Sequence, residues 1–503
     1  MSRINTNVNS LIAQRVLGQQ NNQLNTSLER LSTGLAINRG ADDPAGLIAS
    51  EALRSEKAAI SAAVSNSQRA DQVVNIAEGG LQEVNSLLLE LQSLVGGSAN
   101  DAGLSTEEKQ ANQLQVDSIL QTIDRIASST SFQGAKLLNG TFDFTISGQS
   151  TNVADFTINA AKLAHGETRT VSVVVTASAQ HSGLFLSTGS TVIDLTNNQS
   201  KFVFEVAGAK GSREFTFVSS FSLASAANTI NTFKSVTGVS AKASSTGVVL
   251  KSVGFGSDEF VSVDVSNAGG LATANTGVYQ LSSTNENSAN VAGGATAFGS
   301  ITNPIRDKGQ DVAAIINGVQ ATADGRVARI NTDFLDLSLE LSTAGAQSAS
   351  TFTAFNITGG GAKFNLGPKV NITNQVSVGI QNVAVRNLGN VTDGFLDELG
   401  SGRAKNLVNG DLGAAQKIVD TAITQVSSLR GRLGAFQKNT IGATIRSLGV
   451  ALENTSAAES SIRDTNFASQ TAELTRSQIL VNAATNVLSI ANSQPQSVLQ
   501  LLG

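Results

Sequence analysis

Apolar residues recur at spacings of three and four over residues 57–100. The stripe consists of Val74, Ala77, Leu81, Val84, Leu88, Leu91 and Val95. This is the a/d spacing of a helix that shares one seam with partner helices. Because a straight helix cannot bury a stripe against itself, the pattern predicts a long helix whose partners lie elsewhere in the chain.

Two more helical patterns lie beside this one in the N-terminal part. The first is a heptad stripe formed by Leu17, Leu24, Leu28, Leu31 and Leu35, with mostly Asn, Gln, Ser and Thr on the remaining faces. So narrow a stripe buries little area, and we expect this helix to gain stability only from partners. The second begins at Ser105, which forms a capping box with Glu108, and its stripe is Val116, Ile119, Ile123 and Ile126.

The C-terminal part carries matching stripes. One consists of Leu412, Ala415, Val419, Ala422, Val426, Leu429, Leu433 and Phe436, and a second, shifted in register, consists of Ile441, Ile445, Leu448 and Leu452. A last helix, predicted from about Asn466 to Asn492, carries Leu474, Val481 and Leu488 and is followed by the apolar residues Val498, Leu499, Leu501 and Leu502. These stripes are the predicted partners of the N-terminal ones.

Residues 36–56 interrupt the N-terminal stripes with a turn. We expect Gly40 to end one helix, Asp42 or Asp43 to cap the next, and Pro44 to occupy its first turn, where the missing N–H costs nothing. The two aspartates are also candidate metal ligands. No further ligand cluster accompanies them, so capping and turn formation is the preferred interpretation.

Between about residues 141 and 390 the pattern changes to the alternation typical of strands. Strands are predicted at Thr141–Ser147, Thr170–Thr176, Lys201–Ala207 and Glu214–Val218, and short helices at Ser222–Lys234 and Gln310–Asn317. N- and C-terminal stripes can share a seam only if the chain runs out, forms this insert and returns antiparallel. The predicted fold is therefore mainly α with a β-rich insert: an antiparallel hairpin of long coiled-coil helices from both termini, with one or more β-rich outer domains in the middle.

Composition excludes several kinds of chemistry. The chain has no Cys, and its 34 Lys and Arg against 39 Asp and Glu give a net charge of -5. Disulfides and thiolate sites are therefore excluded, and no basic field for nucleic acid is expected. No apolar run is long enough to span a membrane. The opening MSRINTNVNSLIAQ lacks the apolar region of a cleaved secretory signal, so we expect any export to use a route without one.

Catalytic patterns are not found either. His165 and His181 lie in the insert without an acidic residue at a catalytic spacing, and AHGETR does not match the HExxH zinc motif. Neither of the glycine-rich phosphate-binding motifs occurs. We expect no enzyme activity, no cofactor and no metal site.

Three segments near the chain ends are distinctive: INTNVNSLIAQRVLGQQNNQLNTSLERLSTGLAINRGADDPAGL (4–47), GLQEVNSLLLELQSLVGGSAN (80–100) and IRDTNFASQTAELTRSQILVNAATNVLSIANSQPQSVLQLLG (462–503). They resemble bacterial flagellin, the subunit of the flagellar filament. Motifs of this length at both ends of a chain are highly specific. FNLGPKVNITNQVSVGI (364–380) is similar to the family's β-hairpin, and GQDVAAIINGVQATADG (309–325) to a repeat of flagellin outer domains.

The resemblance implies a division into three domains. These are an inner coiled coil of residues 1–35 and 463–503, a helical domain with a β-hairpin of residues 36–160 and 355–462, and β-rich outer domains over residues 161–354. It also implies a secreted filament subunit for swimming motility, exported unfolded without a cleaved signal. The implied partners are further copies of the chain, an export chaperone, and the cap and hook-junction proteins.

We assign candidate functional residues on this basis. The assembly seam comprises Leu24, Leu28, Leu31, Val74, Leu81, Val84, Leu88, Leu91, Val95, Val419, Val426, Leu429, Leu433, Leu474, Val481, Leu488, Leu499 and Leu502. The spoke turn between the first two helices comprises Gly40, Asp42, Asp43 and Pro44. A candidate receptor or inter-subunit face comprises Leu89, Glu90, Leu94 and Gln115.

Recognition by Toll-like receptor 5 is expected to be weak or absent. The family's receptor-binding positions, usually Arg, Leu and Glu, fall on Glu90, Leu94 and Gln115, and only the leucine is kept. An acid in place of Arg reverses the charge of the contact.

Two other functions stay open. A hook-filament junction protein shares the terminal features, although it diverges from the final SQILVNAATNVLSIANSQPQSVLQLLG. The insert could also act as a surface adhesin or carry an enzyme. Tyr279 is the only Tyr and there is no Trp, which disfavours glycan binding, and we expect the Phe residues of the insert to be core.

Overall fold

The computed structural model describes residues 6–100, 103–164, 166–195, 200–271, 276–281 and 294–502, with side chains described as far as Gln494. The chain forms two compact units. Unit 1 comprises Met1–Gln72, Phe364–Asn374 and Ala435–Gly503, and unit 2 comprises Val73–Lys363 and Gln375–Gly434. Each unit combines segments from both ends of the chain. Helices at the two ends and antiparallel sheets between them confirm the predicted fold class.

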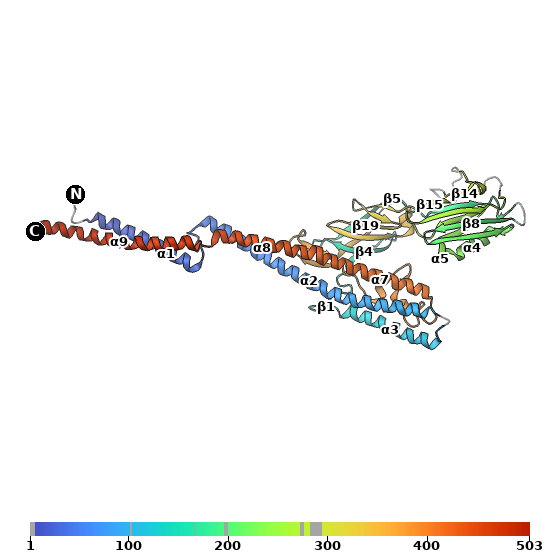
Figure 1. The fold of residues 1–503 in the computed structure, drawn as a ribbon, viewed down its shortest axis with the longest axis horizontal. Helices are drawn as coiled ribbons and strands as arrows, with labels where there is room; N and C mark the ends of the chain where they lie inside the picture. Colours follow the sequence, from blue (N-terminus) through green and yellow to red (C-terminus); the bar gives the residue numbers. More distant parts are fainter. Residues whose placement is uncertain are drawn as a thin grey trace. The chain divides into compact units, whose positions relative to one another are not determined.

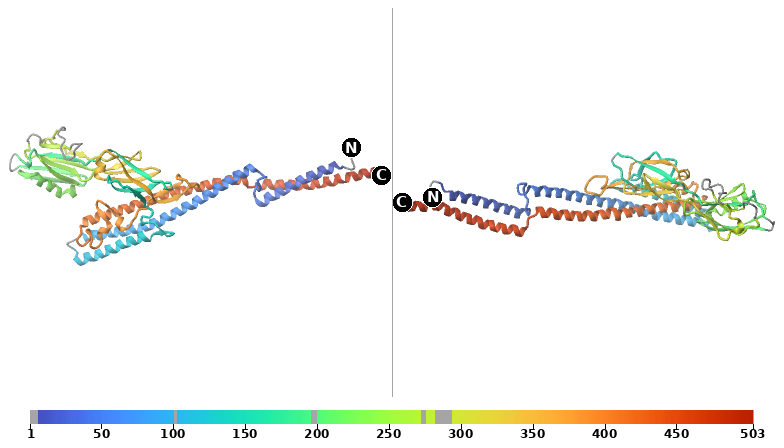
Figure 2. Two further views of the ribbon diagram at one scale, coloured as in Figure 1. Left: turned by 180° about the vertical axis from the view of Figure 1, so that it is seen from behind. Right: turned by 90° about the horizontal axis from the view of Figure 1, so that it is seen from above.

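In unit 1 the first and last helices form an antiparallel pair. Helix α1 (Val8–Thr33) and helix α9 (Phe467–Leu502) lie side by side, with the start of α1 and the last turns of α9 at the same end of the pair (Figures 1 and 2). Helix α1 ends at Gly34, whose positive φ of 74° suits glycine and whose N–H donates to Arg30 O at 3.0 Å. Gly40 lies in the turn beyond, so the prediction that it ends the helix is wrong.

A second antiparallel pair in unit 1 joins the first part of helix α2 to helix α8. Helix α2 runs over Pro44–Ser98, and α8 over Gly442–Arg463. Arg463 Nη1 lies 3.1 Å from Glu51 Oε1, and Lys57 Nζ lies 3.1 Å from Glu459 Oε2. Helix α8, which the structure describes in full, contains no buried residue.

The shift between the two C-terminal stripes has a local cause. Residues Phe436–Ile441 form a π-helix (η6) between α7 (Leu412–Ala435) and α8. A π-helix closes its hydrogen bonds over one more residue than an α-helix does. The apolar stripe therefore steps from Phe436 directly to Ile441.

Unit 2 contains a helical bundle built from α2 beyond Val73, α3 (Thr106–Ser129) and α7. Gln92 Nε2 donates to Asp420 Oδ1 at 2.7 Å and Arg430 Nε to Glu78 Oε1 at 2.8 Å, so α2 and α7 are antiparallel. All residues of the α2 stripe are at most 1% exposed. Buried positions on the other two helices include Val116, Ile119, Ile123, Ala415, Val419, Ala422, Val426, Leu429 and Leu433.

The predicted cap of α3 is confirmed. Ser105 Oγ accepts from Glu108 N at 3.2 Å, and Glu108 Oε2 accepts from Ser105 N at 2.8 Å. A polar side chain of the same helix, Gln113, holds the segment before α7 by donating to Leu399 O and accepting from Leu407 N. The short elements of that segment are η4 (Val385–Asn387), β24 (Gly389–Asn390), β25 (Gly394–Phe395) and η5 (Leu396–Leu399).

The first core of the insert lies between two antiparallel sheets. Their strand orders are β17-β16-β5-β21-β3 and β18-β19-β20-β4. The elements are β3 (Phe144–Ser147), β4 (Val153–Ala161), β5 (Arg169–Ala177), β16 (Ala313–Ile316), β17 (Val319–Gln320), β18 (Thr322–Asp324), β19 (Val327–Asn331), β20 (Leu335–Leu341), α6 (Thr343–Gln347) and β21 (Thr351–Gly360).

The helix predicted over Gln310–Asn317 is wrong, because these residues contribute strand β16. Val312, Ala314 and Ile316 are buried at alternate positions, and β16 pairs with β5. Asn317 and Gly318 both have positive φ and turn the chain into β17, so the Asn-Gly pair marks a hairpin.

The second core of the insert also has two antiparallel sheets. Their orders are β11-β12-β6-β14 and β15-β13-β8-β9. Buried Phe202, Phe204, Phe215 and Phe217 confirm that Phe residues at strand positions are core. The elements are β6 (Gly183–Ser187), β7 (Val192–Ile193), β8 (Lys201–Gly208), β9 (Gly211–Val218), β10 (Phe221–Ser222), α4 (Leu223–Thr232), α5 (Lys234–Thr237), β11 (Val239–Ser244), β12 (Gly247–Ser252), β13 (Phe260–Asn267), β14 (Gly277–Gln280), η3 (Phe298–Ser300) and β15 (Ile305–Lys308).

Two small hairpins complete the structure: β1 (Ser131–Phe132) with β2 (Ala135–Lys136), and β22 (Ala362–Asn365) with β23 (Gln375–Val378). The second is the hairpin expected within residues 364–380. Strands β4 and β21 run across the predicted domain boundaries at 160/161 and 354/355. The division into three domains remains a proposal.

Candidate assembly surface

The seam between α1 and α9 is built mainly from small and half-buried side chains. On α1 it follows Ser10, Ala13, Leu17, Gln20, Leu24, Ser27 and Leu31. On α9 it follows Gln470, Leu474, Ser477, Val481, Ala484, Leu488 and Ala491. Alanine and serine at the buried positions bury little area, so the pair gains little stability from its own seam.

Polar contacts join α1 to α9 at the end of the pair where α1 begins. Asn7 caps α1 by accepting from Ser10 N at 3.1 Å, and its Nδ2 donates to Ala491 O at 2.7 Å. Ser10 Oγ donates to Asn492 Oδ1 at 2.7 Å. A single asparagine thus starts one helix and binds the other.

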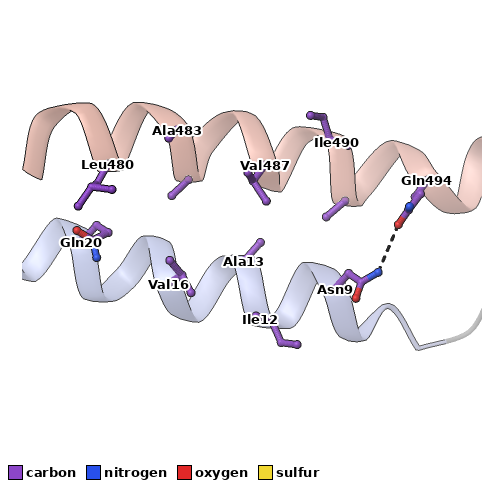
Figure 3. A pocket seen from close by; sticks show the side chains of 12 residues that line it. Asn9, Ile12, Ala13, Val16, Gln20, Leu480, Ala483, Val487, Ile490 and Gln494 are labelled. Atoms are coloured by element: carbon purple, nitrogen blue, oxygen red, sulfur yellow. Dashed lines mark hydrogen bonds between the residues drawn. The ribbon is translucent and has the colours of Figure 1, made fainter.

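An apolar groove of about 530 Å³ runs between the two helices. Ile12 and Val16 from α1 and Leu480, Val487 and Ile490 from α9 supply its large side chains (Figure 3). Ala13, Ala483, Ala484 and Ala491 also line it, with Gln20 near one end and Asn9 bonded to Gln494 at the other. The small seam residues leave room beside them, and the large residues border this space.

Exposed apolar side chains continue beyond the groove. The large exposed apolar residues of the pair are Val8, Leu11, Ile12, Val16, Leu28, Phe467, Ile479, Leu480, Val487 and Ile490. Scattered exposed leucines need no explanation, but a contiguous apolar patch on a polar helix pair marks an interaction surface.

Most of the predicted seam residues of α1 and α9 lie on the α1–α9 seam, but not all of them do. Leu474, Val481 and Leu488 lie on the α1–α9 seam, as do Leu24 and Leu31. Leu28 is 46% exposed and lies off the seam, because Ser27 takes the buried position. Leu499 and Leu502 lie outside the residues whose side chains are described.

The remaining predicted seam residues belong to the bundle of unit 2. Val74, Leu81, Val84, Leu88, Leu91, Val95, Val419, Val426, Leu429 and Leu433 are all buried there. They are closed within one chain, so they support the subunit's own core and offer nothing to a neighbour.

The spoke turn owes its shape to its aspartates. Asp43 Oδ1 accepts from Gly46 N at 2.9 Å, which makes Asp43 the cap of α2, and Pro44 begins the helix. Asp42 Oδ2 accepts from Arg39 N at 2.8 Å and Asn38 N at 3.0 Å. These backbone hydrogen bonds lower the pKa of Asp42. Both aspartates stabilise the turn, as predicted.

The candidate receptor or inter-subunit face lies on α2 and α3 of unit 2. Leu89 is 50% exposed, Glu90 and Gln115 are exposed, and Leu94 is half-buried. Ile76 on α2 and Leu114 on α3 are further exposed apolar residues. Sequence reasoning missed Leu114, which lies off the apolar stripe of α3, and it missed the groove-lining Ile12, Val16, Leu480 and Val487. The spacing of apolar residues in the sequence could have shown that these side chains lie off the main apolar stripes.

The described part of the chain holds no group of three or more His, Cys, Asp or Glu side chains that could bind a metal. The ring centroids of His181 and Phe255 lie 3.7 Å apart, and His181 Nδ1 contacts Gly254 O at 3.0 Å. His165 lies outside the described residues. None of the described helices has the length and apolar character needed to cross a membrane. The arrangement suits a self-assembling structural subunit.

Comparisons with known proteins give the same class. The model of the bacterial flagellin N-terminal helical region matches residues 4–143, and that of the C-terminal helical region matches residues 416–502. The B-type flagellin of Pseudomonas aeruginosa is 30% identical over 533 residues, and a flagellin of Salmonella rubislaw is 28% identical over 510 residues. Both alignments cover 99% of each chain.

A solved structure of FliC from Burkholderia pseudomallei covers 73% of this chain and 98% of that chain, at 15% identity and a TM-score of 0.22, which is too low to add to the argument. The sequence relationship is sufficient: the chain belongs to the flagellin family. It is accordingly a structural subunit of the extracellular filament of the bacterial flagellum, and serves motility.

Proposed function

We propose that the chain polymerises by burying the α1–α9 groove, and the exposed apolar side chains beside it, against the terminal helices of neighbouring subunits. The observation that carries this proposal is the exposure of Ile12, Val16, Leu480 and Val487 around a groove in an otherwise polar pair. A second copy of the chain supplies the matching chemistry, because outside the groove the same helices present Val8, Leu11 and Ile479 to solvent.

A single substitution in the groove tests the proposal. Val487→Gln places a polar group where the neighbour's apolar surface would pack, so we expect polymer yield to fall steeply in sedimentation and electron microscopy. The control is Val236→Gln in the insert, because Val236 is 51% exposed and Val487 is 55% exposed. Normal filaments from Val487→Gln would rule out the groove as an assembly surface.

The same weak seam supports a proposal for export and assembly. Terminal helices with so little buried area are largely disordered in the monomer and order on docking, where burial repays the conformational entropy. Disordered ends suit export of the unfolded chain without a cleaved signal. Deleting Gln496–Gly503 should therefore prevent polymerisation while the insert still folds.

Other partners follow from family membership alone. An export chaperone and the cap and hook-junction proteins are proposed on that basis. Recognition by Toll-like receptor 5 is proposed to be weak, because Glu90 and Gln115 are exposed where the family's usual residues are Arg and Glu. A reporter-cell assay with full activation at ordinary flagellin doses would contradict this.

We also infer that the chain has no catalytic role. Support comes from the packing of His181 against Phe255 and from the many Phe residues of the insert that lie in its two cores. The adhesin alternative loses support for the same reason, since the rings in the two cores are not available to stack on a glycan and Lys162 Nζ lies over the ring of the exposed Phe334.

A further inference from the structure

Polar side chains interrupt the α1–α9 seam at buried or half-buried positions. They are Ser10, Gln20, Ser27, Gln470 and Ser477. Ser10 is satisfied by Asn492. Gln20 Oε1 and Ser477 Oγ are different: in the described part of the chain both atoms are buried without a hydrogen-bond partner.

Such atoms make the pair weaker than its geometry allows. A buried acceptor without a donor loses its hydrogen bonds to water and gains nothing in return. In coiled coils, one polar residue in an apolar seam selects a register and a partner at the expense of stability. The two unpartnered polar side chains, Gln20 and Ser477, therefore destabilise the pair in a way that a leucine or an alanine would not.

Gln20 differs from Ser477 because it also lines the groove. It lies across from Leu480, at the opposite end from the bonded pair Asn9 and Gln494 (Figure 3). An occupant of the groove would therefore pack beside its side chain. Ser477 is not among the residues that line this groove.

We propose that Gln20 is a specificity-determining residue of filament assembly. It keeps the α1–α9 pair from closing stably in the monomer, and on docking its amide turns about the terminal side-chain torsion, so that Oε1, buried in the single chain, accepts a hydrogen bond from a side chain of the neighbouring subunit that fills the groove. The donor is an amide or hydroxyl, which the exposed faces of the two helices supply through residues such as Gln14, Asn21 and Asn482. This inference rests on the assembly surface proposed above.

The test replaces the amide with a side chain of similar shape. Gln20→Met removes the acceptor, and Gln23→Met is the control, because Gln23 is exposed one turn further along α1. We expect the ordering equilibrium of the terminal helices in the monomer to shift toward helix on the order of tenfold. Circular dichroism measures this shift. Seeded filament growth should become slower than in the control, because the docking hydrogen bond is lost.

A second variant separates the two effects. Ser477→Ala removes the other unpartnered atom away from the groove, so it should raise monomer helicity and leave filament growth unchanged. The proposal is overturned if Gln20→Met matches Gln23→Met in either measurement. It is equally overturned if Ser477→Ala slows growth as much as Gln20→Met does, because growth would then follow monomer helicity alone.

The outcome also separates this inference from the proposed assembly surface. If Val487→Gln blocks polymerisation while Gln20→Met behaves as its control, only the role of Gln20 is wrong. If Val487→Gln polymerises normally, the assembly surface itself is wrong, whatever Gln20→Met does.

Discussion

Two adjacent leucines of α2 provide a sharp test of how the subunit divides its apolar residues. Leu88 is 0% exposed in the bundle of unit 2, whereas Leu89 is 50% exposed. Both are in the middle of the same helix, so Leu88→Ala and Leu89→Ala change helix propensity equally. Any difference between the two variants therefore reports burial.

The expected magnitudes follow from the packing. Removing a fully buried leucine side chain loses its transfer free energy and leaves a cavity, at a total cost of roughly 3–4 kcal/mol. Leu89 packs against protein on one side only, so Leu89→Ala should cost about 0.5–1 kcal/mol. We expect the free energy of unfolding of the bundle to differ between the variants by at least about 2 kcal/mol.

Urea unfolding of the monomeric chain measures the difference. Far-UV circular dichroism follows the helices. Fluorescence of Tyr279, the only Tyr in a chain without Trp, follows the insert separately and should change little in either variant. Equal loss of stability in both variants, or a larger loss for Leu89→Ala, would refute the burial argument.

Three further predictions concern other parts of the chain. Burial raises the pKa of Asp143 and of Asp155, because the folded state disfavours their charged forms. The protonated forms therefore stabilise the folded state at low pH, and this contribution to stability is lost as pH rises through the raised pKa. Asp143→Asn should therefore stabilise unit 2 at neutral pH by an amount that shrinks on acidification, as thermal unfolding at several pH values will show; a gain independent of pH would contradict this. Ser105→Ala removes the capping box of α3 and should cost about 1 kcal/mol, with faster amide exchange confined to its first turn; unchanged exchange there would mean that the cap is not needed. Monomer should show less helix than filament by circular dichroism, and equal helicity would exclude ordering on assembly.

Strong periodic stripes could be predicted from sequence alone. The α2 stripe from Val74 to Val95 is buried in the bundle with α3 and α7, as its spacing indicated. Large apolar residues at a/d positions are most stable when they pack in a seam shared with partner helices. Local signals were equally reliable. Ser105 with Glu108, and Asp43 before Pro44, are caps whose hydrogen bonds involve only neighbouring residues.

Weak patterns needed the tertiary structure. Residues 312–316 form a short apolar run that fits a helix or a strand by period, and pairing with β5 made it a strand. In α1 the leucines indicated one stripe, but the seam passes through Ser27 and leaves Leu28 outside. When small and polar residues can occupy the seam, hydropathy no longer shows which face meets the partner helix.

The sequence by itself determined that both chain ends are helices with matching stripes around a β-rich insert, because a repeat of three and four residues or of two is a property of the local chain. It also determined the cap of α3 and narrowed the cap of α2 to Asp42 or Asp43. Only the tertiary structure decided which residues of α1 and α9 form their seam and which surround an open groove. That choice depends on how closely α1 and α9 approach through Ala13, Ala484 and Ala491, and no local pattern encodes the approach of two segments from opposite ends of the chain.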